Sequence, residues 1–339
     1  MTRRILIFNL LLIFLLSCGF LSPSIPPVVD SPPTATPSPI HTLPPSPTQT
    51  SLPTVTPTPA PRFERVLIVS FDGLRPDAIA EADMTNVLSL MQTGAYTFGA
   101  QTIMPSVTLP SHSSMLVGTC PAKHIVRWNE YVPENGYAIG TDLFDLAHAA
   151  GLRTVMVVGK EKLRQVTEPA STDYFAFVDD TDKIKDPFTI EQLAIQQILK
   201  DFNLMFVHFP NGDLQGHNHG WMSYKQLKQY GRDDESFGYI LETLKNMGLY
   251  ESTLIIITAD HGGHDTTHGT DRLEDMTIPW IISGLGIQNR QLMTQVHITD
   301  TAATVAFALG LSIPPEWDGV PVAEAFGLPV EERGLPVCQ

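Results

Sequence analysis

The chain has 339 residues, of which 43% are hydrophobic and 17% are charged, and it carries a formal net charge of -15. This length allows one large hydrophobic core or two smaller ones. The acidic balance argues against a nucleic-acid-binding surface, because no basic patch is present to pair with phosphates.

The N-terminus is typical of an export signal. Two arginines precede an apolar run over residues 5–16, which is too short for an ordinary membrane span. The run ends in Leu-Leu-Ser-Cys, which resembles a bacterial lipobox and implies cleavage before Cys18 and lipidation of that cysteine. We therefore expect residues 1–17 to be a signal peptide and the protein to be an exported bacterial lipoprotein, held at the extracytoplasmic face of a membrane. A plain signal peptide or an uncleaved anchor is the alternative.

Residues 18–61 are predicted to form a disordered linker. Residues 22–61 contain half of the chain's 28 prolines, many Ser and Thr, and a single charged residue, Asp30. Such a segment cannot bury a core and is expected to be extended, partly as polyproline II. It would hold a catalytic domain of residues 62–339 away from the membrane.

From Arg62 onwards, short apolar runs alternate with helical patterns. The sequence predicts strands over residues 66–71, 153–158, 204–209, 253–259 and 278–283. It predicts helices over residues 85–93, 141–150, 189–200, 223–247 and 299–309, with Thr141 as an N-cap and Thr189 with Gln192 as a capping box. This alternation favours an α/β fold with a mostly parallel central sheet covered by helices on both faces.

Two cysteines, Cys120 and Cys338, lie in this domain. Export to an oxidising compartment would permit a disulfide between them, which would tie down the C-terminal tail. Two free thiols are the alternative.

Acidic and histidine residues follow three of the predicted strands. Asp72 comes directly after the first, Asp213 and His217 follow the strand at 204–209, and Asp260 and His261 follow the strand at 253–259. In open α/β sheets the functional site lies outside the carboxyl ends of the strands, so these loops can converge on one crevice. Carboxylate and imidazole ligands suit hard or borderline divalent cations, which makes a two-metal site the leading interpretation.

Four ordered motifs carry a resemblance. They are Ser-Phe-Asp-Gly-Leu-Arg-Pro-Asp at 70–77, Val-Thr-Leu-Pro-Ser-His at 107–112, Asp-Leu-Gln-Gly-His at 213–217 and Thr-Ala-Asp-His-Gly-Gly at 258–263. In order and spacing, across most of residues 64–320, the chain resembles the alkaline phosphatase superfamily and, within it, the nucleotide pyrophosphatase/phosphodiesterase (type I phosphodiesterase) family. The resemblance implies an alkaline-phosphatase-like fold for residues 62–339.

The resemblance also implies two divalent metal ions, expected to be zinc. One would be held by Asp213, His217 and His268, and the other by Asp72, Asp260 and His261, with Thr108 as an oxygen ligand. Thr108 would then be the nucleophile of a metal-dependent hydrolysis of phosphodiester or pyrophosphate bonds, passing through a phosphothreonine intermediate. The alternatives are a phosphomonoesterase, or a phosphoryl transferase that acts on envelope lipids or glycans.

Some assignments stay open on the sequence. Ser106, Ser111 and Ser113 compete with Thr108 as nucleophile, and His264 competes with His268 as ligand. The family has an Asn where this chain has Ser111, so the substrate would be bound by Ser111 or by the amide of Asn129. Lys160 and Lys162 follow a strand end at Gly159, so one of them could reach the substrate, and Lys160 is the one we expect. We expect His112, His124, His208 and His219 to be structural. No aromatic pair that could hold a nucleobase is evident.

Overall fold

The computed structural model describes residues 63–178, 187–330 and 338, so the predicted signal peptide, Cys18 and linker lie outside the described residues. The described chain is built on an 8-stranded sheet of order β4-β3-β5-β1-β6-β7-β2-β8. The strands are β1 (Arg65–Phe71), β2 (Ala95–Gln101), β3 (Thr154–Val158), β4 (Tyr174–Phe177), β5 (Leu204–Phe209), β6 (Thr253–Thr258), β7 (Thr277–Ser283) and β8 (Arg290–Gln291).

Strand β1 lies at the centre of this sheet. It pairs in parallel with β5 on one side and with β6 on the other, so that Ile68 is opposite Phe206 and Ile256. All seven residues of β1 are buried, as are all residues of β5 and β6. Continuous apolar strands of this kind need cover on both faces. Antiparallel pairing is confined to β7 with β6 and with β2, which confirms the mostly parallel sheet.

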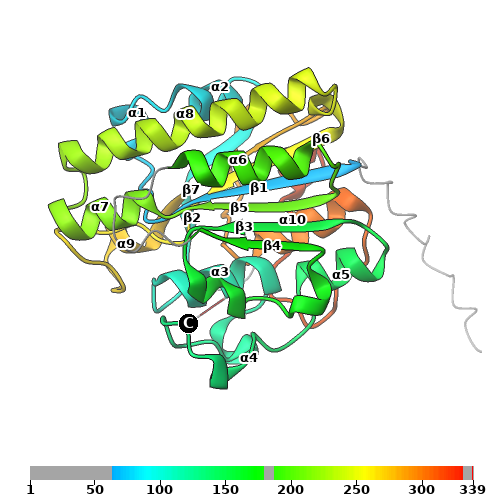
Figure 1. The fold of residues 1–339 in the computed structure, drawn as a ribbon, viewed down its shortest axis with the longest axis horizontal. Coiled ribbons are helices and arrows are strands. Elements are labelled where there is room, and N and C mark those ends of the chain that lie inside the picture. The colour runs from blue at the N-terminus through cyan, green and yellow to red at the C-terminus, as the bar shows by residue number, and fades with distance from the viewer. Residues whose placement is uncertain (1–62, 179–186, 331–337, 339) are drawn as a thin grey trace, which may run out of the picture. The chain divides into compact units, whose positions relative to one another are not determined.

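Helices cover both faces of the sheet (Figure 1). Helix α8 packs against α2, α6 and α7 on one face, whereas α10 packs against α3 and α5 on the other. The helices are α1 (Ala78–Glu81), α2 (Thr85–Met91), α3 (Thr108–Val117), α4 (Pro121–His124), α5 (Leu143–Ala149), α6 (Pro187–Ile198), α7 (Asn211–His219), α8 (Tyr224–Asn246), α9 (Leu273–Met276) and α10 (Asp300–Leu309). None of the helices in the described ranges is both long and apolar enough to cross a membrane.

Two predicted helix starts were wrong. Helix α5 is capped by Asp142, not by Thr141, because the Asp142 carboxylate accepts hydrogen bonds from the backbone of Phe144 and Asp145 in a full capping box. Helix α6 begins at Pro187, so Thr189 lies within its first turn and cannot be its N-cap. Proline is favoured in that first turn because its missing N–H is not needed there.

The predicted disulfide is confirmed. Cys120 and Cys338 are bonded, with their Cα atoms 5.4 Å apart, across a sequence separation of 218 residues. The bond fastens the C-terminal end of the chain beside α4.

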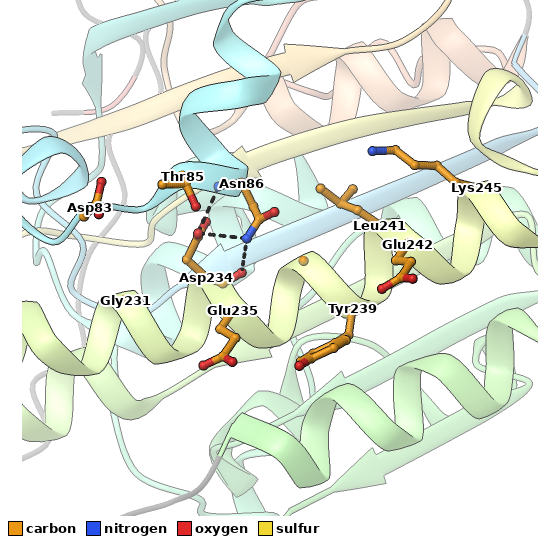
Figure 2. A pocket seen from close by; sticks show the side chains of 11 residues that line it. Asp83, Thr85, Asn86, Gly231, Asp234, Glu235, Tyr239, Leu241, Glu242 and Lys245 are labelled. Atoms are coloured by element: carbon orange, nitrogen blue, oxygen red, sulfur yellow. Dashed lines mark hydrogen bonds between the residues drawn. The ribbon is translucent and has the colours of Figure 1, made fainter.

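A cavity of about 430 Å³ lies between α2 and α8 and is lined by several acidic side chains (Figure 2). One of them, Asp234, has a structural task. Its carboxylate accepts hydrogen bonds from the backbone N–H groups of Asn86 and Val87, both at 2.9 Å, at the start of α2. A carboxylate at this end of a helix satisfies amides that have no partner within the helix.

We expect Asp234→Ala to lower the free energy of unfolding by about 1–3 kcal/mol, because two amides at the start of α2 lose their acceptor. Chemical denaturation of the variant would measure this loss. Glu242→Gln, on the same helix and lining the same cavity, is the matched control and should change stability by less than about 0.5 kcal/mol. Equal stability of Asp234→Ala and the parent protein would contradict this role.

Candidate active site

Three neighbouring strands bring the predicted ligands together. Asp72 follows β1, α7 with Asp213 follows β5, and Asp260 lies two residues beyond the end of β6. Because β5, β1 and β6 are adjacent and parallel, their carboxyl ends meet at one edge of the sheet. All three carboxylates are at least 96% buried there, with relative exposures of 0%, 4% and 0%.

The first predicted ligand group is assembled as expected. Asp213 and His217 lie four residues apart on α7, so both side chains share one face of the helix. The Oδ1 atom of Asp213 is 3.4 Å from Nε2 of His217 and 3.5 Å from Nε2 of His268. His268 therefore lies with this group, whereas His264 is hydrogen-bonded to Asp275.

The second group surrounds His261. Its Nε2 atom lies 3.5 Å from Oδ1 of Asp72 and 3.3 Å from Oδ2 of Asp260. Atoms of Asp72, Asp213 and His261 also fall within 4.8 Å of one another, so Asp213 lies close to both groups. The adjacent residues Asp260 and His261 can both point inward because the chain is irregular after β6.

Hydrogen bonds to the backbone orient the three histidines. Nδ1 of His217 lies 3.0 Å from the carbonyl oxygen of Thr266. Nδ1 of His261 lies 2.8 Å from that of Gly262, and Nδ1 of His268 lies 2.9 Å from that of Ser106. A carbonyl oxygen can only accept, so each Nδ1 carries the proton and each Nε2 presents a lone pair to the site. This is the arrangement that metal-ligating histidines use.

Small residues let a tryptophan support these ligands. The indole of Trp221 contacts the rings of His217 and His268 edge-on, and its Nε1 donates to the carbonyl of Gly73 at 3.0 Å. A Cβ at Gly216 or Gly263 would lie within 2.8 Å or 2.1 Å of that indole. The glycine of Asp-Leu-Gln-Gly-His is therefore required by packing against Trp221.

Lys160 lies among the acidic ligands. Its Nζ atom is 2.7 Å from Oδ2 of Asp72, 2.6 Å from Oδ2 of Asp213 and 3.1 Å from Oγ1 of Thr108. Burial would raise the pKa of both carboxyls, but the ammonium of Lys160 holds both pKa values well below their usual range. Asp260 has no such close cation, and burial beside Asp72 raises its pKa well above the ordinary value.

Thr108 is the first residue of α3, and its preceding residue Val107 is extended. Oδ1 of Asn129 accepts a hydrogen bond of 2.9 Å from the backbone N–H of Leu109 and so caps this helix. Thr108, Asn129 and Lys160 line one cavity of about 500 Å³ together with Asp213, His217 and His268.

Ser111 lies outside the cavity that Thr108, Asn129 and Lys160 line. Its side chain is fully buried, its Oγ lies 3.2 Å from Oγ1 of Thr102, and it is not among the residues that line the cavity. One helical turn beyond Thr108, it faces the interior, so the predicted contact between Ser111 and the substrate has no support from this geometry.

His208 supports the site, although the sequence pointed only to a buried strand residue. The backbone N–H of Gly159 donates to Nδ1 of His208 at 3.2 Å, so Nε2 carries the proton and donates to Oδ2 of Asp72 at 2.8 Å. His112 bonds the carbonyl of Thr108 through Nδ1 and the hydroxyl of Ser70 through Nε2. His208 thus fixes the carboxylate of Asp72 and His112 contacts the first residue of α3, and neither histidine joins the two groups.

The residues present fit divalent cations. Four buried polar atoms that face the site have no hydrogen-bond partner within the described residues. They are Oδ1 of Asp72, Oδ1 of Asp213, Oδ2 of Asp260 and Nε2 of His261. Buried polar atoms are normally satisfied, and a mixed carboxylate and imidazole set is one that zinc and similar ions accept. The site therefore has the donors for metal ions and an excess of negative charge to attract them.

Solved structures with the same architecture include a murine ectonucleotide pyrophosphatase/phosphodiesterase 5 and a 2-O GAG sulfatase. The first aligns with a TM-score of 0.64 at 15% identity, covering 78% of this chain and 99% of that one. The second aligns with a TM-score of 0.66 at 16% identity, covering 80% and 76%. At these identities the likeness confirms the alkaline-phosphatase-like fold.

Sequence relatives include the catalytic subunit of human GPI ethanolamine phosphate transferase 2, 29% identical over 81% of this chain and 29% of that protein. Ectonucleotide pyrophosphatase/phosphodiesterase family member 1 of Rattus norvegicus is 25% identical over 58% of this chain and 24% of its own length. The chain thus spans less than a third of either relative. The family model for type I phosphodiesterase / nucleotide pyrophosphatase matches residues 66–281, and the chain belongs to that family.

Proposed function

We propose that this protein hydrolyses phosphodiester or pyrophosphate bonds at a two-metal site, with Thr108 as the nucleophile. The observation that carries the proposal is the position of Thr108. Thr108 is the first residue of α3 and lines the cavity beside the ligand residues. Its hydroxyl oxygen accepts a hydrogen bond of 3.1 Å from Nζ of Lys160. Family membership supports the same class of reaction.

Two divalent ions, zinc by preference, would be held by the two ligand groups described above. Asp213, His217 and His268 would hold one, and Asp72, Asp260 and His261 the other, with Thr108 completing the second set. When bound, such ions neutralise phosphoryl oxygens and lower the pKa of a coordinated hydroxyl.

The chain's own residues then position and activate the nucleophile. His112 and Asn129 fix the first turn of α3, so Thr108 is held ready for in-line attack. The hydroxyl of Thr108 would lose its proton to water, and its oxygen would form a bond to phosphorus while the bond to the leaving alkoxide or phosphate breaks. Water would then attack the same phosphorus, release the phosphate product and return a proton to the threonine oxygen. The carboxylates of Asp213 and Asp72 outweigh burial and raise the pKa of Lys160, so its ammonium, 3.1 Å from Oγ1 of Thr108, would stabilise a threonine oxyanion.

A phosphoryl transferase is the second candidate. The observation that favours it is the 29% identity to the GPI ethanolamine phosphate transferase 2 catalytic subunit over most of this chain. In that case an alcohol, not water, would accept the phosphoryl group from Thr108. Adding acceptor alcohols and analysing the products by mass spectrometry separates the two outcomes.

Substitution of the nucleophile is the direct test of the hydrolase. We expect Thr108→Ala to lower turnover of bis(p-nitrophenyl) phosphate by at least about 10³-fold. The number of zinc ions bound per protein should stay close to that of the parent protein, because the six other ligand residues remain. Ser111→Ala is the matched control on the same helix and should cost less than about tenfold. A Thr108→Ala enzyme of near-parent activity would refute the assignment.

Metal removal should destabilise the protein. Without added cations the carboxylates of Asp72 and Asp213 share one lysine and the carboxyl of Asp260 is buried with a raised pKa, so a bound ion stabilises the folded state by mass action. We expect a chelator to lower the melting temperature by several degrees and zinc to restore it. Asp213→Asn should lose most of this response, whereas Glu242→Gln should keep it. A chelator-insensitive melting temperature in zinc-loaded protein would count against the metal site.

We also propose that the protein is an exported lipoprotein anchored through Cys18. The disulfide between Cys120 and Cys338 supports export, because such bonds persist in oxidising compartments. Expression with radiolabelled palmitate in a bacterial host should label the parent chain and leave Cys18→Ser unlabelled. Labelling of Cys18→Ser, or an unprocessed parent chain, would speak against the lipid anchor.

A further inference from the structure

The catalytic cavity extends beyond the metal ligands and Thr108. Its volume of about 500 Å³ lies within the range of small-molecule sites. The remaining lining comes from segments that carry none of the ligands. It consists of Asn129, Glu130, Tyr131, Lys160, Glu161, Lys162 and Phe177. Two lysines and two aromatic rings therefore lie beside the nucleophile, in a region where the sequence indicated no aromatic pair.

Lys162 is a cation without an adequate partner. Its side chain is only 16% exposed, and the ion pair recorded for it within the described residues is with Glu130 at 4.0 Å. Glu130 is itself 85% exposed, so solvent screens that pair strongly. Burial and the nearby charge of Lys160 both lower the pKa of Lys162. Holding an ammonium in this position costs free energy unless an anion arrives to compensate it.

The frame around Lys162 is rigid. Lys162 lies in the 3₁₀ turn η2 (Glu161–Gln165), next to the buried Leu163. The side-chain amide of Gln165 donates to the carbonyls of Val132 and Gly136, at 2.7 and 2.6 Å. Its Oε1 accepts from the backbone of Val132 at 2.9 Å and from the indole of Trp128 at 3.2 Å. Gln165 thus binds the loop that carries Asn129 and Tyr131 to the turn that carries Lys162.

We propose that Lys162 is a specificity-determining residue that binds a second anionic group of the substrate, beside Tyr131 and Phe177. The inference rests on the proposed function. The reacting phosphodiester carries one negative charge, which the ions held by the two ligand groups, with Lys160, would already neutralise. A further ammonium on the same cavity, on a side chain that is 16% exposed, matches a further oxyanion, namely the second phosphate of a pyrophosphate or a carboxylate on the substituent. The substrate class is therefore a phosphoryl compound with an additional anion close to the reacting phosphorus.

The test measures binding separately from turnover. Isothermal titration calorimetry of the full-length, zinc-loaded protein in detergent would compare methylphosphonate, methylenediphosphonate and 3-phosphonopropionate. The first has no second anion, the second adds a phosphonate, and the third adds a carboxylate. Excess zinc is held constant, so that chelation by a ligand affects every variant equally.

We expect Lys162→Gln to lower the binding affinity for the ligand with the matching second anion by about 10-fold or more, relative to its effect on methylphosphonate. This loss corresponds to one charge-assisted hydrogen bond. Lys162→Arg should retain most of the affinity. Lys228→Gln, on an exposed position of α8, is the control and should leave all three affinities unchanged. The ligand whose affinity falls identifies the second anion as phosphate or carboxylate.

Two results would overturn the inference. One is a parent protein that binds both of the ligands with a second anionic group no more tightly than methylphosphonate. The other is a Lys162→Gln variant that keeps the parent's preference while its melting temperature shows it to be folded. Failure of the proposed function looks different, because it appears as absent hydrolysis of bis(p-nitrophenyl) phosphate by the zinc-loaded parent whatever these affinities are.

Discussion

The buried negative charge at the carboxyl ends of β5, β1 and β6 is the constraint on which the rest of the site depends. Asp72, Asp213 and Asp260 are withdrawn from water within one small volume, and a single buried lysine contacts two of them. Carboxylates so placed are costly unless cations and hydrogen bonds compensate them. The protonated Nε2 of His208 and the ammonium of Lys160 compensate part of this charge, and the two divalent ions that we propose would compensate the rest.

The scaffold keeps this charge in place through rigid and tightly packed elements. The strands that end at the site are buried along their whole lengths, so their ends cannot move apart without opening the core. Trp221 reaches the histidines only because Gly216 and Gly263 leave room for its ring. The Nδ1 atoms of His217, His261 and His268 each donate a hydrogen bond to a backbone carbonyl, so Nε2 faces the site in all three.

Much of this could be predicted from the sequence because the signals are local. Apolar runs marked five of the strands, and the acidic and histidine residues that follow three of them come together at one edge of the sheet. Strand β2 was missed because it is half exposed and irregular near Gly99, and Asp142 was missed as a cap because its partners appear only once the turn is formed.

The wall of the cavity that carries Lys162 could be predicted only in part. The position of Lys160 and Lys162 after a strand end indicated that one of them could reach the substrate, whereas no pattern in their own segments placed Tyr131 and Phe177 in the same cavity. Gln165 joins two of these segments through hydrogen bonds to residues about 30 positions away, and only tertiary structure reveals such bonds. His208 was read as an ordinary buried strand residue for the same reason, since its partner Asp72 lies 136 residues away.

The central claim is that Thr108 becomes covalently bonded to phosphorus. The most direct measurement is rapid acid quenching of the zinc-loaded protein during turnover of bis(p-nitrophenyl) phosphate, followed by digestion and mass spectrometry of the peptide that contains residues 106–117. We expect a phosphoester adduct on Thr108 that forms within the first turnover and decays as substrate is exhausted. Turnover at full rate with that peptide unmodified at every quench time, or with the adduct on a neighbouring serine, would contradict it.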